Sequence, residues 1–315
     1  MAVIRVERPG ALTTVQDGGR PGLAHLGVPR SGALDPSAHR LANRLVGNPE
    51  TAAVLETTLT GVTLAFDGLR GPLAVAVTGA AAPVTVDGRP AAPGAAIAVG
   101  PGQVLDVGRA RAGVRSYIAV AGGLAVPVTL GSASTDLLSG LGPARLTAGQ
   151  NLTVAPSPGP PPAASPPTRS PSSGPSSSGP PPAGPTPPGR PDAYPEPGRS
   201  IELPARLGPR ARWLTPAGRA TLAQERFTVA IASNRIGLRL EGPPVRSAAE
   251  GELPSEGIVW GAVQLLPDGG LVVFLADHPT TGGYPVVAVV DPAGFSACAQ
   301  AAPGTEVRFR ILAHG

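Results

Sequence analysis

The sequence predicts a mainly β protein, and three observations carry that prediction. Its 315 residues include 43 glycines and 41 prolines, which favour turns and short strands over long helices. Hydrophobic residues make up 42% of the chain but aromatic residues only 3%, so the core is expected to be built from Val, Leu, Ala and Ile. The apolar runs do not alternate regularly with helical patterns, which argues against a doubly wound α/β sheet.

The N-terminal part consists of short apolar runs separated by turn signals such as Asp87-Gly88 and Pro101-Gly102. This pattern is typical of a barrel or a sandwich. The expected strands are Leu73–Thr78, Val84–Val86, Ala96–Val99 and Ser116–Val120.

One helix is expected over residues 35–46. Asp35 is a suitable N-cap, Pro36 fits the first turn, and Gly47 is a suitable stop. Between them Ala38, Leu41, Ala42, Leu45 and Val46 form one apolar stripe at helical spacing. We expect this helix to pack on a sheet.

The C-terminal part repeats the β pattern after a second helix start at Thr215-Pro216, which is expected to run to about Gln224. Strands are expected at Phe227–Ala232, Ile258–Leu266, Leu271–Ala276, Val286–Val290 and Val307–Leu312.

Residues 156–199 separate the two parts. Of these 44 residues 18 are proline, 8 serine and 6 glycine, a composition that cannot bury a core and predicts a disordered linker. The expected domains are therefore 1–155, an N-terminal β domain, and 200–315, a C-terminal β-barrel domain.

Composition also excludes several chemistries. All 25 basic residues are arginine, so a lysine Schiff base, a Walker-type ATP site, lysine-linked biotin on this chain and a Ser-Lys hydrolase are excluded. A single cysteine, Cys298, has no local nucleophile signature and is interpreted as a small core residue. The four histidines lack metal spacing, so no metal is expected.

The arginines are scattered, which argues against nucleic acid as a partner. No signal-peptide stretch opens the sequence and no apolar run approaches a membrane span of about 18 residues. We therefore expect no membrane partner and a cytoplasmic protein.

The stretch from Asp277 to Pro285 carries the densest functional chemistry, with a carboxylate, hydroxyls, a phenol and two adjacent glycines between two apolar runs. Loops held by buried strands often carry chemistry. A tight hairpin rich in turn residues is the equally weighted alternative. Within this stretch His278 is the one histidine expected to act as an acid or a base.

A second glycine-rich stretch, residues 16–35, runs into the start of the expected helix. Its backbone N–H groups together with Arg20 or Arg30 are suited to an anion. The alternative is structural: Asp35 only caps the helix, and Asp17 forms an ion pair with Arg20.

Three further features lie in the C-terminal part. Arg235 and Arg239 would share one face of a strand, where they could clamp a carboxylate or phosphate, or else be solvated surface residues. Glu256 is a candidate general base, although an unpaired surface role is the commoner one. Trp260 and Gln264 are expected to share a face at strand spacing.

Many motifs in a fixed order resemble the biotin-dependent carboxyltransferase family called allophanate hydrolase subunit 2, across both globular parts. They include Gln16-Asp17-(x)2-Arg20, Gly27-Val28-Pro29-(x)-Ser31-Gly32-Ala33-Leu34-Asp35, Ala42-Asn43-(x)2-Val46-Gly47-Asn48, Leu130-Gly131-Ser132, Ser233-(x)-Arg235, Ser255-Glu256-Gly257, Gln264 and Thr280-Thr281-Gly282-Gly283-Tyr284-Pro285.

The resemblance implies two cyclophilin-like β-barrel domains with a few short helices. Bacterial members of the family include the C component of 5-oxoprolinases and an antagonist of a kinase inhibitor. The resemblance thus implies one component of an ATP-dependent complex that opens 5-oxoproline to glutamate, inactive alone. Its expected partners are a homologue of the B component and a third, catalytic component. ATP is expected in the complex.

Two other functions fit the resemblance. One is a urea-carboxylase-like carboxyltransferase component that takes carboxybiotin from a separate carrier. The other is a non-enzymatic antagonist of a kinase inhibitor. The substrate is expected to be a small cyclic amide or a urea-like molecule.

The loops and the resemblance together give the candidate site. The catalytic candidates are Asp277, Thr280, Thr281 and Glu256. The candidates for substrate binding are Gln16, Asp17, Arg20, Ser31, Asp35, Asn43, Arg235, Gln264, Gly282, Gly283 and Tyr284.

Overall fold

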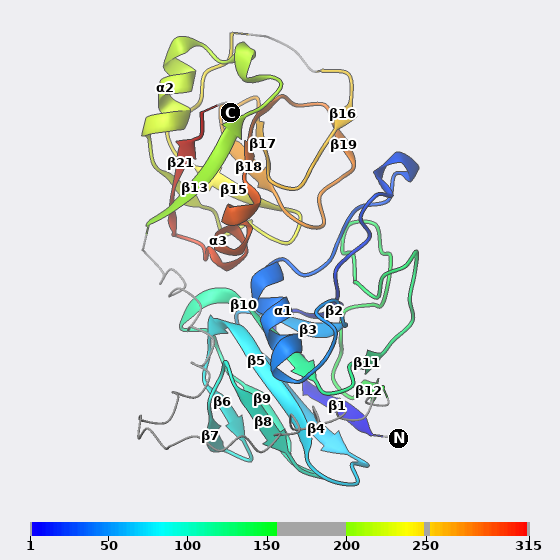
Figure 1. Ribbon diagram of the computed structural model, residues 1–315. Coiled ribbons are helices and arrows are strands. Elements are labelled where there is room, and N and C mark those ends of the chain that lie inside the picture. The colour runs from blue at the N-terminus through cyan, green and yellow to red at the C-terminus, as the bar shows by residue number, and fades with distance from the viewer. Residues whose placement is uncertain (1, 156–199, 249–252, 314–315) are drawn as a thin grey trace, which may run out of the picture.

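The computed structural model describes residues 2–155, 200–248 and 253–313. They form an N-terminal lobe, residues 2–155, and a C-terminal lobe, residues 200–313, which lie one above the other in Figure 1. No strand of one lobe pairs with a strand of the other among these residues. The expected linker, 156–199, lies outside the described residues.

The N-terminal lobe is built from two antiparallel sheets, both of them open. The seven-stranded sheet has the order β11 (Leu124–Ala125), β12 (Asn151–Val154), β1 (Val3–Arg8), β4 (Val62–Asp67), β9 (Val104–Val107), β6 (Val84–Val86) and β7 (Arg89–Ala91). The five-stranded sheet has the order β2 (Thr13–Gln16), β3 (Val54–Thr58), β10 (Ala112–Val120), β5 (Leu73–Ala81) and β8 (Ala96–Val99).

The core of this lobe lies between the two sheets, where Phe66 of β4 and Ile118 of β10 belong to one buried cluster. The outer face of the five-stranded sheet is covered by helix α1 (Pro36–Leu45), which packs Ala38 and Ala42 against Tyr117. Every residue of β10 is therefore buried, as expected for a strand covered on both faces.

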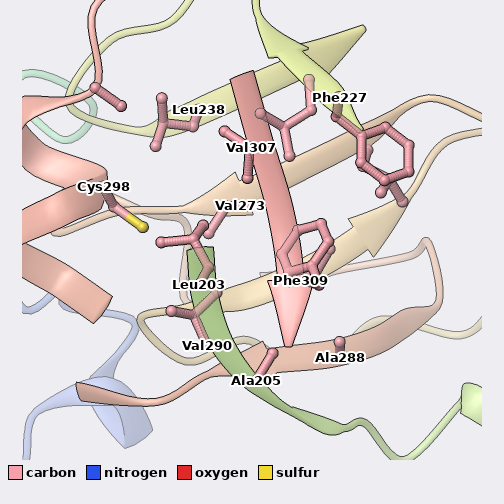
Figure 2. Close-up of a cluster of buried hydrophobic side chains, with 14 of the residues drawn as sticks. Leu203, Ala205, Phe227, Leu238, Val273, Ala288, Val290, Cys298, Val307 and Phe309 are labelled. Atoms are coloured by element: carbon pink, nitrogen blue, oxygen red, sulfur yellow. The ribbon is translucent and has the colours of Figure 1, made fainter. Parts of the chain in front are cut away.

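The C-terminal lobe is a closed barrel of seven strands. Their order is β13 (Ser200–Leu207), β20 (Val286–Val290), β17 (Ala262–Leu265), β18 (Leu271–Phe274), β15 (Gly237–Glu241), β14 (Phe227–Val229) and β21 (Glu306–Ile311). Figure 2 shows its apolar interior, where Phe309 of β21 and Val290 and Ala288 of β20 belong to one buried cluster. A separate two-stranded ribbon pairs β16 (Glu256–Gly257) with β19 (Thr281–Gly282).

The two expected helices are confirmed as α1 and α2 (Pro216–Gln224). A third helix, α3 (Phe295–Gln300), was not expected, because it has only six residues and no side-chain cap at its start. Three short 3-10 helices complete the described elements: η1 (Ala24–Leu26), η2 (Ala211–Trp213) and η3 (Pro292–Gly294).

The hairpin alternative for Asp277–Pro285 is wrong. The runs on either side of it become β18 and β20, but β17 lies between these strands in the barrel. The stretch therefore leaves the barrel after β18, pairs through β19 with β16, and returns to β20. Sequence proximity suggested a hairpin, whereas the pairing of both strands with β17 decides the topology.

Candidate functional site

The buried side chain of Arg235 lies at the centre of the interface between the lobes. Its Nε and Nη2 lie 2.8 Å and 2.9 Å from the two carboxylate oxygens of Asp277. From the N-terminal lobe it meets the carboxylate of Glu56, to which Nη1 donates, and the carbonyl of Gly32, 2.8 Å from Nη2. The side chains of Arg235, Glu56 and Asp277 are at most 1% exposed, so the lobes share a buried ionic network.

The charges of Arg235 and Glu56 reinforce each other, whereas burial raises the pKa of Asp277 in spite of the guanidinium beside it. Burial acts to lower the pKa of Arg235, but the carboxylates of Asp277 and Glu56 outweigh it and raise that pKa above its usual value. Burial likewise acts to raise the pKa of Glu56, yet the guanidinium groups of Arg235 and Arg115 hold it below its ordinary range. Arg235 and Glu56 are therefore both ionised at neutral pH.

Gln300 of α3 forms a second polar bridge between the lobes. Its Oε1 accepts the backbone N–H groups of Val114 and Arg115 at 2.9 and 3.0 Å, and its Nε2 lies 2.9 Å from Oδ2 of Asp35. Gly113 permits this approach because it has no Cβ, and a Cβ there would lie 2.7 Å from Oε1 of Gln300. Its φ of 78° is also a conformation that favours glycine.

Asp35 has a structural role that the sequence anticipated. Its Oδ1 accepts the N–H of Ala38 at 3.1 Å, which caps α1, and also the hydroxyl of Ser296 at 2.8 Å. With Gln300 on its other oxygen, the carboxylate joins α1 to α3. These contacts support the capping interpretation, and the role of Asp35 in substrate binding stays a prediction.

Asp17 and Arg20 hold the segment 129–135 rather than each other, so the alternative of an ion pair between them is wrong. The pair was inferred from sequence spacing, but the two side chains diverge to different groups of this segment. The carboxylate of Asp17 accepts bonds from Gly19 N, Ser132 Oγ, Ala133 N and Ser134 Oγ. Arg20 donates to the carbonyls of Thr129, Ser132 and Ser134.

Gln16 adds to the same support. Its Nε2 lies 3.0 Å from both the hydroxyl of Thr14 and the carbonyl of Thr135, and its side chain is fully buried. The side chains of Gln16, Asp17 and Arg20 thus hold the conformation of the loop through hydrogen bonds within the lobe.

Ser31 is the point where the two glycine-rich stretches of the sequence meet. Its N–H lies 3.0 Å from the carbonyl of Ala276, and its hydroxyl lies 2.8 Å from Oδ2 of Asp136. Its φ is 53°, an uncommon conformation for a residue other than glycine, so these contacts hold strained backbone. Together with the bonds of Arg235 to Gly32 and Asp277, they join the two loops that we predicted to form one site.

A small pocket of about 100 Å³ opens beside Ser31, between α1 and the C-terminal lobe. The guanidinium carbon of Arg30 lies 5.2 Å from the centre of the Trp260 ring, and Trp260 stacks on Phe295 with ring centres 4.4 Å apart. The pocket is lined by Asp17, Gly18, Arg30, Ser31, Ala33, Pro36, His39, Arg40, Glu50, Thr51 and Trp260.

Four of the remaining predicted residues, Glu256, Thr280, Thr281 and Gly282, lie along the β16–β19 ribbon, away from the lining of this pocket. Thr281 pairs with Gly257 and Gly282 with Glu256, whose carboxylate forms an ion pair with Arg210. Thr280 and Gly283 contribute backbone carbonyls that accept bonds within the ribbon region.

Tyr284 and Gln264 belong to the same side of the C-terminal lobe. The amide of Gln264 donates to the carbonyl of Tyr284 at 3.0 Å. Tyr284 lines a larger open groove of about 790 Å³ together with Trp213 and Arg246. The predicted residues are therefore divided between the interlobe region and this ribbon, and their roles in catalysis and binding stay predictions.

Two expected pairings on strands are wrong. Arg235 precedes β15 and is buried, whereas Arg239 within β15 is exposed, because the chain turns at Asn234 before the strand begins. Trp260 and Gln264 do not share a face either. Gly261, with φ of 85°, separates Trp260 from β17 and lets its ring join the core cluster.

Three other predicted residues have clear surroundings. Asn43 is buried in α1 and donates to the carbonyl of Ala52 at 2.9 Å, so it fixes the segment after the helix. His278 is buried, with Nδ1 2.7 Å from the carbonyl of Pro279, and burial lowers its pKa. Cys298 points into the barrel core in Figure 2, and burial raises the pKa of its thiol to about 12, which confirms its structural interpretation.

Sequence reasoning gave no role to Glu56, Trp260 or Gln300. The carboxylate of Glu56, which directly follows the apolar pair Val54-Leu55, was a usable signal, since buried carboxylates are rare unless paired. The partners of Gln300 lie 185 residues or more away in the chain, so no local pattern could reveal them.

The described part of the chain contains no group of three or more His, Cys, Asp or Glu side chains arranged for a metal ion. None of the helices in these same residues has the length and apolar character needed to cross a membrane. The interlobe pocket is well below the roughly 300–1,000 Å³ of typical ligand sites, so its residues do not fit a whole nucleotide such as ATP.

Three curated relatives match almost the whole chain. The chain is 33% identical over 312 residues to the 5-oxoprolinase C component of Escherichia coli, covering 98% of this chain and 90% of that protein. It is 30% identical to the 5-oxoprolinase C component of Haemophilus influenzae, covering 95% and 88%. It is also 32% identical to the urea amidolyase of Lachancea kluyveri, where the match covers 96% of this chain but only 16% of that protein.

Solved structures agree with the fold. The crystal structure of TTHA0988 superposes with a TM-score of 0.78 at 34% identity, covering 98% of this chain and 55% of that one. The urea carboxylase of Kluyveromyces lactis gives a TM-score of 0.79 at 30% identity, covering 99% and 27%. The chain thus spans only part of these longer proteins.

The family model that matches is the carboxyltransferase domain, subdomain A and B, over residues 26–311. Those residues run from the glycine-rich loop of the N-terminal lobe to the last barrel strand, and include Ser31, Glu56, Arg235 and Asp277 at the interface. The chain belongs to the carboxyltransferase domain, subdomain A and B, family.

Proposed function

We propose that this chain is the C component of an ATP-dependent 5-oxoprolinase complex, which opens 5-oxoproline to glutamate and in which the chain alone is inactive. The observation that carries the proposal is the extent of its match. It aligns with 90% and 88% of two proteins named as the C component of 5-oxoprolinase, but with only 16% and 17% of two urea amidolyases.

The arrangement of the interlobe region supports a component that binds a small anionic molecule. Opening a lactam breaks its C–N bond and places negative charge on the carbonyl oxygen, which hydrogen-bond donors and guanidinium groups stabilise. That stabilisation belongs to the assembled complex, because the catalytic candidate Asp277 is occupied by Arg235. Arg30 places a cation beside the pocket, where it can bind an anionic group of the substrate. ATP and the third component belong to the proposed complex, and we assign no residue of this chain to the nucleotide.

A protein partner is supported by the loop between β11 and β12. It carries the exposed apolar side chains of Val128, Leu130, Leu137 and Leu138, which are 41–66% exposed. Apolar side chains gathered on a surface often mark an interaction site. Leu137 N lies 3.4 Å from Oδ2 of Asp277, so this loop adjoins the interlobe network. The partner we propose is the homologue of the B component.

The test is reconstitution. The chain is purified alone and with its B-component homologue and third component, and glutamate release from 5-oxoproline is measured with and without ATP. We expect ATP-dependent release only from the assembled complex. Full activity of the isolated chain, or no glutamate from a correctly assembled complex, would contradict the proposal.

A second candidate function is a urea-carboxylase-like carboxyltransferase component that uses carboxybiotin on a separate carrier. The 30% identity and TM-score of 0.79 with the urea carboxylase of Kluyveromyces lactis favour it specifically. Bicarbonate-dependent ATP consumption by the complex, with urea as acceptor and without glutamate release, would select this function.

A further inference from the structure

Arg30 and Trp260 both line the interlobe pocket and carry hydrogen-bond donors without acceptors among the described residues; Arg30 is exposed at the pocket, whereas Trp260 is buried. The guanidinium of Arg30 forms no ion pair or hydrogen bond with any described residue, and it lies over the ring of Trp260. Trp260 is only 9% exposed, and its Nε1 is a buried polar atom that finds no acceptor among the described residues. Buried polar groups nearly always have a partner, so this donor points to an acceptor that residues 2–155, 200–248 and 253–313 do not supply.

The two carboxylates of the pocket wall do not fill this role. Asp17 already accepts four hydrogen bonds from its own lobe. Glu50 is paired with Arg44, whose Nη1 lies 2.8 Å away, and more loosely with Arg40 at 3.9 Å. Among the described residues, Arg30 is therefore the cation of the wall that remains without a carboxylate, and it is held in place by the aromatic ring beneath it.

The pocket is also built on rigid supports. The Trp260 ring is stacked on Phe295, with an angle of 7° between the planes. Ser31, next to Arg30, is fixed by its bonds to Ala276 and Asp136 in spite of its strained φ. A donor pair held in this way is preorganised for a small planar acceptor.

We infer that Arg30 and Trp260 form a carboxylate-binding subsite, which takes the carboxylate of a small acid at the interface between the lobes. A volume of about 100 Å³ admits a group of a few atoms, and a guanidinium binds a carboxylate by charge-assisted hydrogen bonds. The inference rests on the proposed function in one respect: 5-oxoproline carries a carboxylate beside its lactam, whereas urea carries none. The subsite thus selects the acid over the neutral amide.

The experiment compares three ligands by calorimetry on the full chain, alone and with its partner components. They are 5-oxoproline, 2-pyrrolidinone, which has the lactam ring without the carboxylate, and acetate, which has the carboxylate without the ring. We expect 5-oxoproline to bind at least about tenfold more tightly than 2-pyrrolidinone, because charge-assisted hydrogen bonds are worth that much.

Two variants and one control test the residues. Arg30→Gln removes the charge, and Trp260→Phe keeps a ring beside Phe295 but removes the N–H group. Each should weaken the binding of 5-oxoproline at least about tenfold and raise the KM of the complex more than it lowers kcat. Arg219→Gln removes an exposed arginine of α2 that does not line the pocket, and should bind like the parent chain. Circular dichroism and thermal melting check that each variant folds.

The inference is overturned if 2-pyrrolidinone binds as tightly as 5-oxoproline, if Arg30→Gln binds like the parent chain, or if no carboxylate binds in either state. Its failure is separable from that of the proposed function. A complex that makes glutamate with an unchanged KM in Arg30→Gln contradicts the subsite alone. Acetate binding that depends on Arg30, in a complex that makes no glutamate, supports the subsite and contradicts the 5-oxoprolinase proposal.

Discussion

Arg235 shows how one residue decides whether two lobes form one site. A buried guanidinium is costly unless all its charge and donors are matched, and here two carboxylates and one carbonyl match them. Because Glu56 and Gly32 come from one lobe and Asp277 from the other, the geometry is satisfied only when the lobes dock correctly. The same bonds place Ser31 beside the end of β18, where the interlobe pocket opens.

Replacing Arg235 by methionine should therefore be strongly destabilising. The variant leaves the carboxylates of Asp277 and Glu56 buried without their cation, and breaking a buried ion pair in this way costs about 3–5 kcal/mol. The measurement is the free energy of unfolding from urea titrations. Arg239→Met, an exposed arginine four residues later, is the matched control and should change stability by less than about 0.5 kcal/mol. Equal effects of the two variants would show that the network contributes little.

At the scale of elements, local sequence patterns predicted the bounds of several strands and of helix α1, which depend on local interactions. The strands Val84–Val86, Ala96–Val99 and Val286–Val290 were placed with their observed bounds, and α1 follows its cap and apolar stripe. What failed depends on distant contacts. The placing of β17 between β18 and β20 and the short helix α3 are decided by packing across the barrel.

The candidate site divides in the same way. Its loops could be recognised as glycine-rich stretches, because backbone conformations that are open mainly to glycine place glycines in the sequence. The docking of Arg30 on Trp260 was not visible, since it joins residues of two lobes. The positive φ of Gly261, which separates Trp260 from strand β17, could not be predicted from the spacing of apolar residues either.

Helix α3 offers a prediction at this scale, because its last residue connects it to β10. Gln300→Ala would leave the N–H groups of Val114 and Arg115 without their acceptor, along with the lost bond to Asp35. Each buried group left unpaired costs about 1–3 kcal/mol, so we expect a loss of about 2–4 kcal/mol in the free energy of unfolding. Gln224→Ala, at the exposed end of α2, should stay within about 0.5 kcal/mol. A loss from Gln300→Ala no larger than that control would contradict the bridging role.

At the scale of the whole molecule, the lobes are separate in their sheets but joined in their interior. No strand pairing crosses between them in the described residues, yet Leu34 of the N-terminal lobe belongs to the apolar cluster of the barrel. Arg235 and Gln300 add polar bridges between the lobes. A site built from both lobes depends on this interface, since the pocket wall takes Arg30 from one and Trp260 from the other.

The interface should hold the lobes together even when the chain between them is cut. A protease site placed within residues 156–199 allows this test, and after cleavage the two pieces should elute as one species in size-exclusion chromatography at moderate salt. The reason is that separation would expose the apolar contact of Leu34 and strand the charges of Glu56 and Asp277. The same cut made in Arg235→Met should release the pieces at lower urea concentration, whereas the cut Arg239→Met control should not. Pieces that separate freely in the parent chain would show that covalent linkage, rather than the buried network, keeps the site assembled.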